Sequence, residues 1–436
     1  HRLSKMVLVI DEAQDMDASE FALINALISH NEDMRVIAVG DDDQNIYEFR
    51  GANSKYMQQL ITDRGAIVYE LIENYRSKNN LVDFTNQYVL GISKRMKTTP
   101  ISAVQRDNGK ITLVHYQGKK LIVPFVDDIL SSELMGTTCV MTYRNEDAIQ
   151  IAGLLMRNGA SVKLIQTNEG FTLYHLLEIR FFLSQLNMSD DEYIIGDDRW
   201  ENAIRTLKNR FSKSPNLELC MNIVKDFEAA NSKKKYKSDL DIFIRESKME
   251  DFIAQKTDII FVSTIHKAKG KEFDHVFLLL NGFDDRTDDA MRQIYVALTR
   301  AKSNLTVHYN GNYFDSIRAE AMTRIEDKGT YPSPSELTMQ LTHKDIWLDF
   351  FLSCQPIIRQ MRSGDELIAE ETCCRSSRGQ VVVRFSKQFI DKMEYLGQRG
   401  YKPTSASVKY IVYWQKEGRN REIRIVLPEL VLTPFF

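Results

Sequence analysis

The sequence predicts an α/β protein with parallel sheets, a helical insertion and a small C-terminal module resembling a β-barrel. Short apolar runs rich in β-branched residues alternate with helical patterns, which is typical of parallel sheets flanked by helices. A polar, helix-patterned stretch interrupts this alternation, and from about residue 340 the pattern changes to short antiparallel strands. The expected segments are the α/β parts 1–78, 79–180 and 258–335, the insertion 181–257 and the β module 340–436.

Apolar periodicity gives the expected elements in chain order. Residues 19–29 carry apolar side chains at helical spacing, between runs that read as buried strands. The strands expected in the α/β parts are 6–10, 35–39, 67–71, 111–115, 138–142, 162–166, 258–263, 275–280 and 305–309. Those expected in the β module are 364–367, 381–385, 408–414 and 422–427. The segment 328–335 has the Gly, Pro and Ser content of a linker.

The composition excludes several classes of protein. With 436 residues, 43% hydrophobic and 27% charged, the chain is expected to be an ordinary soluble protein of two to four domains. It has no long uncharged apolar run and no signal-peptide pattern at its start. A net charge of −3 argues against nucleic-acid binding over the whole surface but allows a local basic channel. Five scattered cysteines lack zinc-site spacing and favour a reducing cytoplasm.

Two acids follow the first expected strand, a position typical of phosphate-hydrolysing sites. Asp11, at the carboxyl end of the strand, is predicted to hold Mg²⁺, usually through water. Glu12 is then placed to orient or deprotonate the attacking water. Taken alone, an acidic pair in this place is more often an exposed turn after a core strand.

A second polar loop follows the next strand. Gln44 ends the run 40–44, where its amide can hydrogen-bond a γ-phosphate or the attacking water. The three preceding acids would repel a polyanion, so most of them are expected to face water or to cap the next helix. Arg76 and Arg300 are the candidates for stabilising transition-state charge. They lie in separate α/β parts and can serve one nucleotide only if both parts face a common cleft; otherwise each is a surface ion pair.

Six segments in a fixed order resemble superfamily 1 DNA helicases of the UvrD/Rep/PcrA type. The similarity covers roughly residues 5–310. Its segments are DEAQD at 11–15 (motif II), GDDDQNIYEFRGA at 40–52 (motif III), ENYRS at 73–77 (motif IV), MTYRN at 141–145 (motif IVa), TIHKAKGKEF at 264–273 (motif V) and YVALTRA at 295–301 (motif VI). This resemblance implies two RecA-like P-loop NTPase lobes, of which the first is incomplete here.

The resemblance also implies roles for individual residues, with ATP and Mg²⁺ as cofactors. Tyr75 would stack on adenine and Glu272 would lie near the ribose. The residues implied to contact single-stranded DNA are Tyr47, Phe49, Arg50, Arg144, Thr264 and His266. Aromatic stacking on bases tolerates any sequence, as a translocating motor requires.

The chain departs from the family pattern in several places. Phe49 stands where the family usually has Trp, and Ile265 and Lys267 stand where motif V usually has Leu and Ser. The insertion is shorter than the family's 2B domain. No loop ending in Gly-Lys-Ser/Thr occurs in the sequence, although such a motor needs one to hold phosphate. We therefore expect a carboxy-terminal portion of a larger motor, similar also to the UvrD-like halves of bacterial RecQ-type helicases.

The β module is locally basic, with twelve Lys or Arg against four Asp or Glu between Arg375 and Arg424, and aromatic residues among them. This mixture suits contact with nucleic acid or protein, but a solvated basic surface over core aromatics explains it equally well. By resemblance, the module would be an SH3- or Tudor-like domain for docking partners.

The resulting prediction is part of an ATP-dependent, 3′-to-5′ single-stranded DNA translocase or helicase. It would act in the cytoplasm at the bacterial nucleoid, on single strands and on junctions of single and double strands, without a membrane. This portion alone would be inactive. Two alternatives remain: a non-hydrolysing nucleic-acid-binding or scaffold module of a larger fused protein, and a helicase–nuclease subunit, for which no carboxylate cluster follows residue 301.

Overall fold

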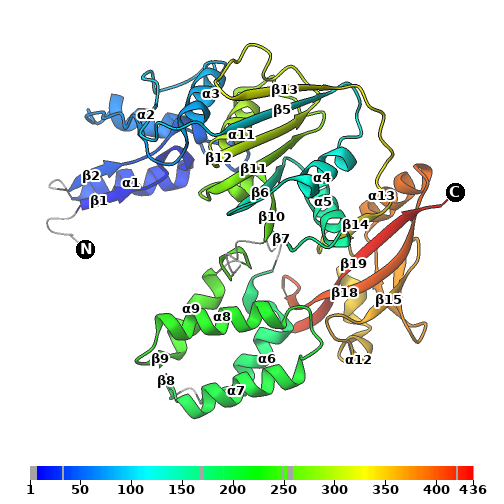
Figure 1. Cartoon of the computed structure of the whole chain (residues 1–436). Coiled ribbons are helices and arrows are strands. Elements are labelled where there is room, and N and C mark those ends of the chain that lie inside the picture. The colour runs from blue at the N-terminus through cyan, green and yellow to red at the C-terminus, as the bar shows by residue number, and fades with distance from the viewer. Residues whose placement is uncertain are drawn as a thin grey trace. The chain divides into compact units, whose positions relative to one another are not determined.

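The computed structural model describes residues 7–31, 34–165, 171–189, 191–247, 249–252, 259–418 and 421–435. The chain divides into two compact units. The first unit comprises 1–148 and 257–333, and the second comprises 149–256 and 334–436 (Figure 1).

The first unit begins with two short parallel strands joined by a helix. Strand β1 (Val7–Ile10) pairs with β2 (Arg35–Ala38), and α1 (Ala18–His30) lies between them in the chain. Helix α1 starts where expected because Asp17 accepts hydrogen bonds from the backbone N–H groups of Ser19 and Glu20, while Glu20 caps in return. Four short helical segments complete this part: η1 (Ala13–Asp15), η2 (Asp42–Gln44), η3 (Glu48–Arg50) and α2 (Lys55–Thr62).

The strand expected at 67–71 does not form, so this prediction was wrong. Ile67 and Tyr69 are 78% and 82% exposed, and the short ladder that does form joins β3 (Glu73–Asn74) to β4 (Ser102–Ala103). Among the strands that the structure describes, β1 and β2 pair only with each other. The apolar run therefore has no ladder to join, which periodicity along one segment cannot reveal.

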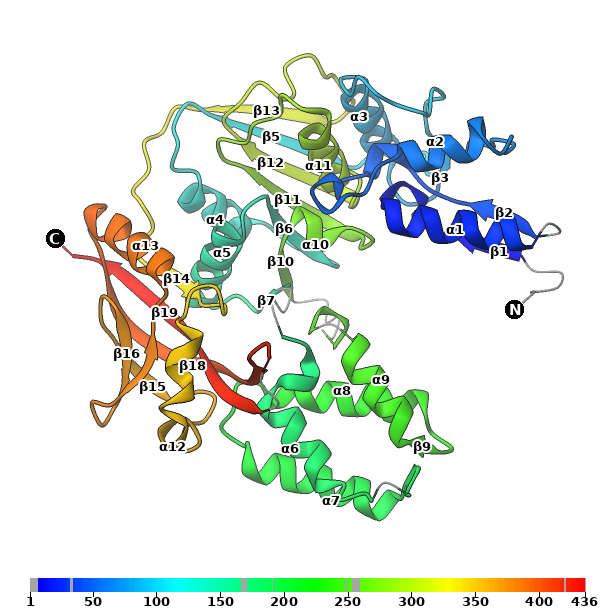
Figure 2. The same ribbon diagram turned by 180° about the vertical axis from the view of Figure 1, so that it is seen from behind.

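A parallel sheet dominates the rest of the first unit, with strands in the order β13-β5-β12-β11-β6-β10. The strands are β5 (Lys110–Tyr116), β6 (Thr138–Thr142), β10 (Ile260–Thr264), β11 (Phe273–Leu280), β12 (Ala301–Tyr309) and β13 (Met322–Asp327). The helices are α3 (Asn79–Val89), α4 (Ile122–Ser131), α10 (Ile265–Ala268) and α11 (Asp288–Leu298). Every residue of β6 and β10 is buried, as in a parallel sheet that is covered on both faces (Figures 1 and 2).

The strands predicted in this sheet are confirmed within a few residues. Met6, Gln166 and Asp258, at the ends of three expected strands, lie outside the described residues. Helix α5 (Asn145–Arg157) and strand β7 (Val162–Leu164) follow β6 in the chain.

The second unit contains the predicted helical insertion. Its helices are α6 (Leu177–Gln185), α7 (Asp197–Arg210), α8 (Leu217–Ala230) and α9 (Lys237–Glu246), with short segments η4 (Leu173–His175) and η5 (Met249–Phe252). A small antiparallel pair, β8 (Ile194–Ile195) with β9 (Lys235–Tyr236), joins two of its loops. Lys235, in the lysine-rich segment 233–237, is buried, and its ammonium lies 2.9 Å from Asp197 Oδ1.

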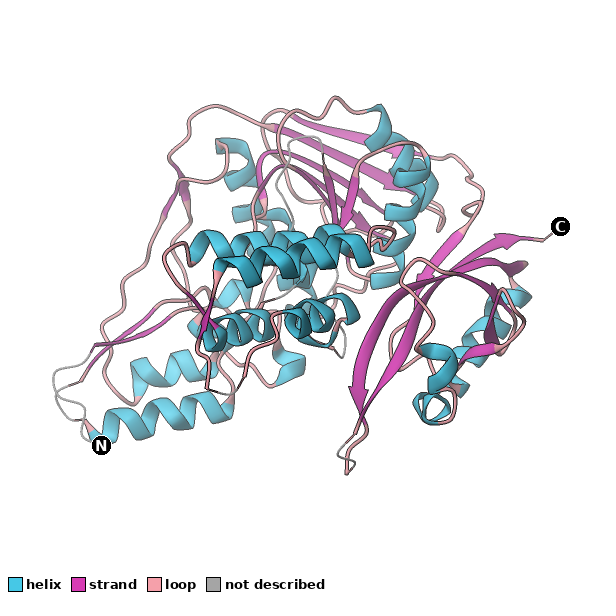
Figure 3. Cartoon of the chain, turned by 90° about the horizontal axis from the view of Figure 1, so that it is seen from below, coloured by secondary structure: helices cyan, strands magenta, loops and turns pink. Residues whose placement is uncertain are grey.

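An antiparallel sheet forms the C-terminal part of the second unit (Figure 3). Its order is β14-β19-β18-β15-β16-β17, with β14 (Leu337–Gln340), β15 (Glu366–Ala369), β16 (Cys373–Ser376), β17 (Val381–Arg384), β18 (Tyr401–Gln415) and β19 (Glu422–Pro434). The end strands β14 and β17 share no ladder in the part that the structure describes, so a closed barrel is not confirmed. Sequence reasoning missed β14 and β16, together with η6 (Leu348–Leu352), α12 (Gln355–Ile358) and α13 (Lys387–Gln398).

The helical insertion and the β module share one hydrophobic core. Phe182 and Trp200 from the helices and Val412 and Ile425 from the long strands belong to the same buried cluster, and Leu176 forms a β-bridge with Val412. These contacts make the module a packing partner of the insertion within the same chain.

Arginines and tyrosines alternate where the helices meet the module. The Arg180 guanidinium pairs with both oxygens of Glu422, at 3.2 and 2.7 Å. Its Cζ lies 4.9 Å from the Tyr174 ring centroid and 4.7 Å from that of Tyr413. Arg245 also contacts Tyr174, with its Cζ 3.5 Å from the ring centroid. These arginine and tyrosine side chains, for which the sequence indicated no partners, thus contact one another within the second unit.

Three basic residues of the β module form ion pairs within it, namely Arg375 with Glu370, Lys409 with Glu429 and Lys416 with Asp349. Tyr401 and Tyr410 are buried, which accords with the reading of core aromatics beneath a basic surface. All five cysteines are buried and unbonded. In the described ranges, helices that could cross a membrane are absent.

Replacing Arg180 with Ala should weaken the second unit. The variant loses a bidentate ion pair and two cation–π contacts at a half-buried site, so we expect a loss of about 1–3 kcal/mol in the free energy of unfolding. Urea unfolding followed by the fluorescence of buried Trp200 measures this loss. Arg199→Ala is the control, because it breaks an equally short bidentate pair with Glu192 on the surface. Equal losses in both variants would contradict the prediction.

Candidate functional site

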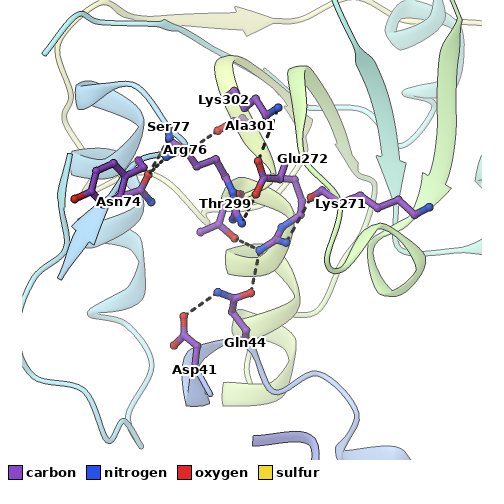
Figure 4. A network of polar contacts seen from close by, with 12 residues as sticks. Asp41, Gln44, Asn74, Arg76, Ser77, Lys271, Glu272, Thr299, Ala301 and Lys302 are labelled. Carbon is purple, nitrogen blue, oxygen red and sulfur yellow. Dashed lines mark hydrogen bonds and ion pairs between the residues drawn. The ribbon is translucent and has the colours of Figure 1, made fainter. Parts of the chain in front are cut away.

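Polar side chains from separate segments of the first unit converge beyond the ends of β1, β2 and β10 and near the end of α11 (Figure 4). Gln44, Arg76, Glu272 and Arg300, all predicted from the sequence, belong to this convergence. The segments that carry them are far apart in the chain, and the contacts below bring them together.

The loops after β1 and β2 are joined through Gln14. Its Nε2 donates to Glu12 Oε2 at 2.5 Å, and its Oε1 accepts from Asp41 N–H at 2.9 Å. A Cβ atom at Gly40 would lie 2.5 Å from Gln14 Oε1, so a larger residue there would displace the Gln14 side chain from these contacts. Glu12 has φ 51° and ψ 42°, a left-handed backbone that is rare for a glutamate and is typical of functional sites. Asp11 Oδ1 accepts from the Glu12 N–H at 2.9 Å.

A buried lysine from motif V lies beside these acids. Lys269 Nζ is 2.6 Å from Asp15 Oδ2, 3.8 Å from Glu12 Oε2 and 5.0 Å from the Tyr47 ring centroid. Burial raises the pKa of Asp15, and the lysine opposes that rise. Sequence reasoning missed Lys269, although its place within a recognised motif was the available signal.

Arg300 contacts Gln44 directly. Its Nη2 donates to Gln44 Oε1 at 2.9 Å and to Thr299 Oγ1 at 3.0 Å, while its Nε donates to the Val296 carbonyl at 2.9 Å. The side chain is almost wholly buried, and this burial, with the nearby Arg76, lowers the pKa of Arg300 to about 10. It stays charged at neutral pH. The two α/β parts therefore meet at the residues proposed to act together.

Arg76 lies on the other side of Thr299. Its Nη2 is 2.6 Å from Glu272 Oε1, and its Nη1 donates to the Thr299 carbonyl at 3.2 Å. Asn74 Oδ1 accepts from the backbone N–H groups of Arg76 and Ser77 and so shapes this turn. The Nε of Arg76 is buried without a hydrogen-bond partner in the described structure.

In this network the buried Arg300 and the half-buried Arg76 have the carboxylate of Glu272 beside them (Figure 4). Arg76 lowers the pKa of Arg300, which is the sign of two like charges close together. An anion at this position would offset that repulsion. Tyr75, adjacent in the chain, exposes 69% of its surface, and its hydroxyl donates to Glu73 Oε2 at 2.5 Å.

Two of the three acids before Gln44 neither face water nor cap a helix, which corrects the expectation from the sequence for these two. Asp42 and Asp43 are buried, and only Asp41 caps the short helix η2. Their carboxylates are within the distance at which a cation could be shared, but each already has a partner on Arg95, Met96 or Lys97. Local sequence patterns could not reveal these partners, because they lie some fifty positions away.

Aromatic and basic residues from motifs III and V form a second cluster. The Tyr47 hydroxyl donates to the His266 carbonyl at 3.2 Å, and the Phe49 ring meets the His266 ring edge-on at 5.5 Å. Arg50 Cζ lies 5.4 Å from the centroids of both Tyr47 and Phe49. Phe49 is 68% exposed, so one aromatic face is open to a ligand.

Two other predicted DNA contacts stand apart from this cluster in the contacts described. The Arg144 guanidinium lies over the Tyr143 ring at 4.7 Å, and Thr264 is buried at the end of β10. The structure therefore assembles four of the six predicted residues into one group.

Two family models match the chain. The UvrD/REP helicase N-terminal domain matches residues 3–65, and the UvrD-like helicase C-terminal domain matches residues 197–312. These matches include motifs II, III, V and VI. The chain is therefore similar to UvrD/Rep-type superfamily 1 helicases over these two regions.

Individual relatives are distant. A probable DNA helicase II homolog of Mycoplasma capricolum is 24% identical over 409 residues, covering 72% of this chain and 56% of the relative. The ATP-dependent DNA helicase Rep of Buchnera aphidicola is 21% identical, covering 69% of this chain and 62% of the relative. The chain thus spans less than two thirds of the length of these helicases. The solved C-terminal domain of a possible DNA helicase from Lactobacillus plantarum has 14% identity over 58% of this chain and 98% of that domain, with a TM-score of 0.28 that supports no argument.

Acid should weaken the first unit through His266. Burial lowers the pKa of His266, so its neutral form is favoured in the folded state, and the charged neighbours Arg50 and Lys267 act in the same direction while Asp289 opposes them. The associated stability is fully present above the unfolded pKa of about 6.5 and is lost as pH falls toward the lowered folded value. Replacing His266 with Gln should therefore make the free energy of unfolding less sensitive to pH between about 7 and 5. If the free energy of unfolding changed with pH in the same way for the wild type and the variant, His266 would not be the cause of the acid sensitivity.

Proposed function

We propose that this chain is the portion, from motif II onward, of an ATP-dependent single-stranded DNA translocase or helicase. The observation that carries the proposal is the contact of Arg300 with Gln44 next to Arg76, which gathers motifs III, IV and VI around one excess of positive charge. The 3′-to-5′ direction follows from the family resemblance.

In this proposal the segments 1–78, 79–180 and 258–335 are two RecA-like lobes, and ATP binds where they meet. Gln44 would hydrogen-bond the γ-phosphate or the attacking water. Arg76 and Arg300 would offset charge on the phosphoryl group, which can accelerate transfer by about 10³–10⁵. Glu272, now paired with Arg76, would lie near the ribose, and exposed Tyr75 would stack on adenine.

The residues present fit an ATP phosphate group. Two neighbouring guanidiniums, one of them with the unpartnered Arg76 Nε, are groups that a phosphate would satisfy. Asp11 would hold Mg²⁺, usually through water, and Glu12 would orient the hydrolytic water. Bound Mg²⁺ neutralises charge that develops on the phosphates. Lys269 pairs with Asp15, and its ammonium lies 3.8 Å from Glu12 Oε2. In this proposal the ammonium moves away from Glu12 when Glu12 orients the hydrolytic water.

Single-stranded DNA, alone or at a junction with duplex, is the proposed polymer. Tyr47, Phe49, Arg50 and His266 offer stacking faces and a cation within one cluster. Base stacking contributes about 1–3 kcal/mol per base without selecting sequence. Arg144 and Thr264 are proposed to contact the strand further along, as the resemblance implies.

The exposed strands of the first unit support the proposal of an incomplete lobe. Val7, Val9 and Ile37 are 53%, 61% and 51% exposed, although strands of a parallel sheet are normally buried. Further strands carrying a phosphate loop would cover this apolar surface, and the 436 residues contain no Gly-Lys-Ser/Thr loop. We propose that hydrolysis needs such a loop upstream.

Single-strand-stimulated ATP hydrolysis tests the function, measured on this chain and on a version extended upstream through a phosphate loop. We expect little turnover from this chain and DNA-stimulated turnover from the extended protein. In the extended protein, Arg300→Ala should lower kcat by about 10³-fold or more, because a charge stabiliser is lost. Sustained turnover by this chain would refute the need for the upstream loop. An extended protein that binds DNA but hydrolyses nothing would favour the scaffold alternative.

A further inference from the structure

Three consecutive residues bind three consecutive acids in reverse order. Arg95 Nε and Nη2 donate to the two oxygens of Asp43, both at 2.8 Å. The Met96 N–H donates to Asp42 Oδ2 at 2.6 Å, and Lys97 Nζ lies 3.4 Å from Asp41 Oδ1. The segment 93–97, which we call the strap, follows α3, whereas the acids precede Gln44. The strap therefore holds the loop that carries Gln44.

The same contacts orient Gln44 itself. Asp41 Oδ2 accepts from Gln44 Nε2 at 2.8 Å, which leaves Gln44 Oε1 to accept from Arg300 Nη2 at 2.9 Å. Asp43 is adjacent to Gln44 in the three-residue helix η2, so a shift of Asp43 moves Gln44. The position of the glutamine thus depends on both ends of the acidic run.

The strap is also tied to the helix that leads to Arg300. Asp288, at the start of α11, accepts from Ser93 N–H at 3.0 Å, from Ser93 Oγ at 2.8 Å and from Lys94 N–H at 3.0 Å. Arg292, one turn later on α11, donates to the Lys94 carbonyl at 2.6 Å and lies 3.4 Å from Glu48 Oε1. The strap consequently bridges the loop of Gln44 and the helix that ends just before Arg300.

We propose that the strap sets the position of Gln44 against Arg300, with Arg95 as its main positioning residue. The geometric part of this inference stands on the contacts alone, and its effect on hydrolysis rests on the proposed function. Asp43 is fully buried, so loss of Arg95 leaves an uncompensated charge that must move toward water. A misplacement of about 1 Å at a reacting group can cost about 10²-fold in rate.

Hydrogen–deuterium exchange on this chain tests the geometric part without nucleotide. Arg95→Met keeps most of the side-chain volume but removes the charge and the two guanidinium hydrogen bonds to Asp43. This variant should exchange the amide hydrogens of residues 42–47 severalfold faster than the wild type. Arg95→Lys, which keeps the charge, should fall between this variant and the wild type. Lys97→Met probes the other end of the strap if Arg95→Met fails to fold. The control is Arg199→Met, which breaks a bidentate pair on the surface of the second unit.

Unchanged exchange at 42–47 in the strap variants would overturn the inference, as would equal acceleration throughout the first unit, which reports general destabilisation. Kinetics of the extended protein give the second readout. Arg95→Met should lower kcat by about tenfold or more while KM for ATP changes by less than about twofold, and Arg95→Lys should recover part of the loss. A raised KM with unchanged kcat would refute the positioning role. An inactive extended wild type would refute the proposed function, and the exchange result would still decide the geometry.

Discussion

The hydrogen bond from Arg300 to Gln44 is the contact on which the arrangement of the first unit depends. It joins a loop after β2 to the residue that follows α11, 256 positions later in the chain. Burial of the guanidinium makes this contact costly to lose, because each hydrogen bond of a buried charge offsets part of its desolvation. The neighbouring contacts of Arg76 with Thr299 and Glu272, and of Lys269 with Asp15, extend the same junction.

Electrostatics explain why this junction suits a phosphate. Burial and the nearby Arg76 lower the pKa of Arg300, and Glu272 opposes this effect. The carboxylates of residues 41–43 do not pair with these two arginines in place of a phosphate. They are already bound by Arg95, Met96 and Lys97. The site therefore separates its negative groups, which position Gln44, from its positive groups, which are available to an anion.

The sequence predicted the elements whose cause is local. The helix expected at 19–29 from its apolar spacing forms at 18–30, and the strands of the parallel sheet follow from their apolar runs. The strand expected at 67–71 failed because pairing requires a neighbouring strand, which periodicity does not specify. Motif order identified Gln44, Arg76 and Arg300, whereas Arg95 and Lys97 carried no motif and were found only through their contacts. The shared core of the insertion and the β module was likewise invisible, since it joins segments about two hundred positions apart.

A double-mutant cycle between Gln44 and Arg300 tests the central contact most directly. The free energy of unfolding of this chain would be measured for Gln44→Ala, Arg300→Ala and the double variant. A direct hydrogen bond to a charged group predicts a coupling of about 1–3 kcal/mol. Effects that add within about 0.5 kcal/mol would show that the two residues do not interact and would contradict the account.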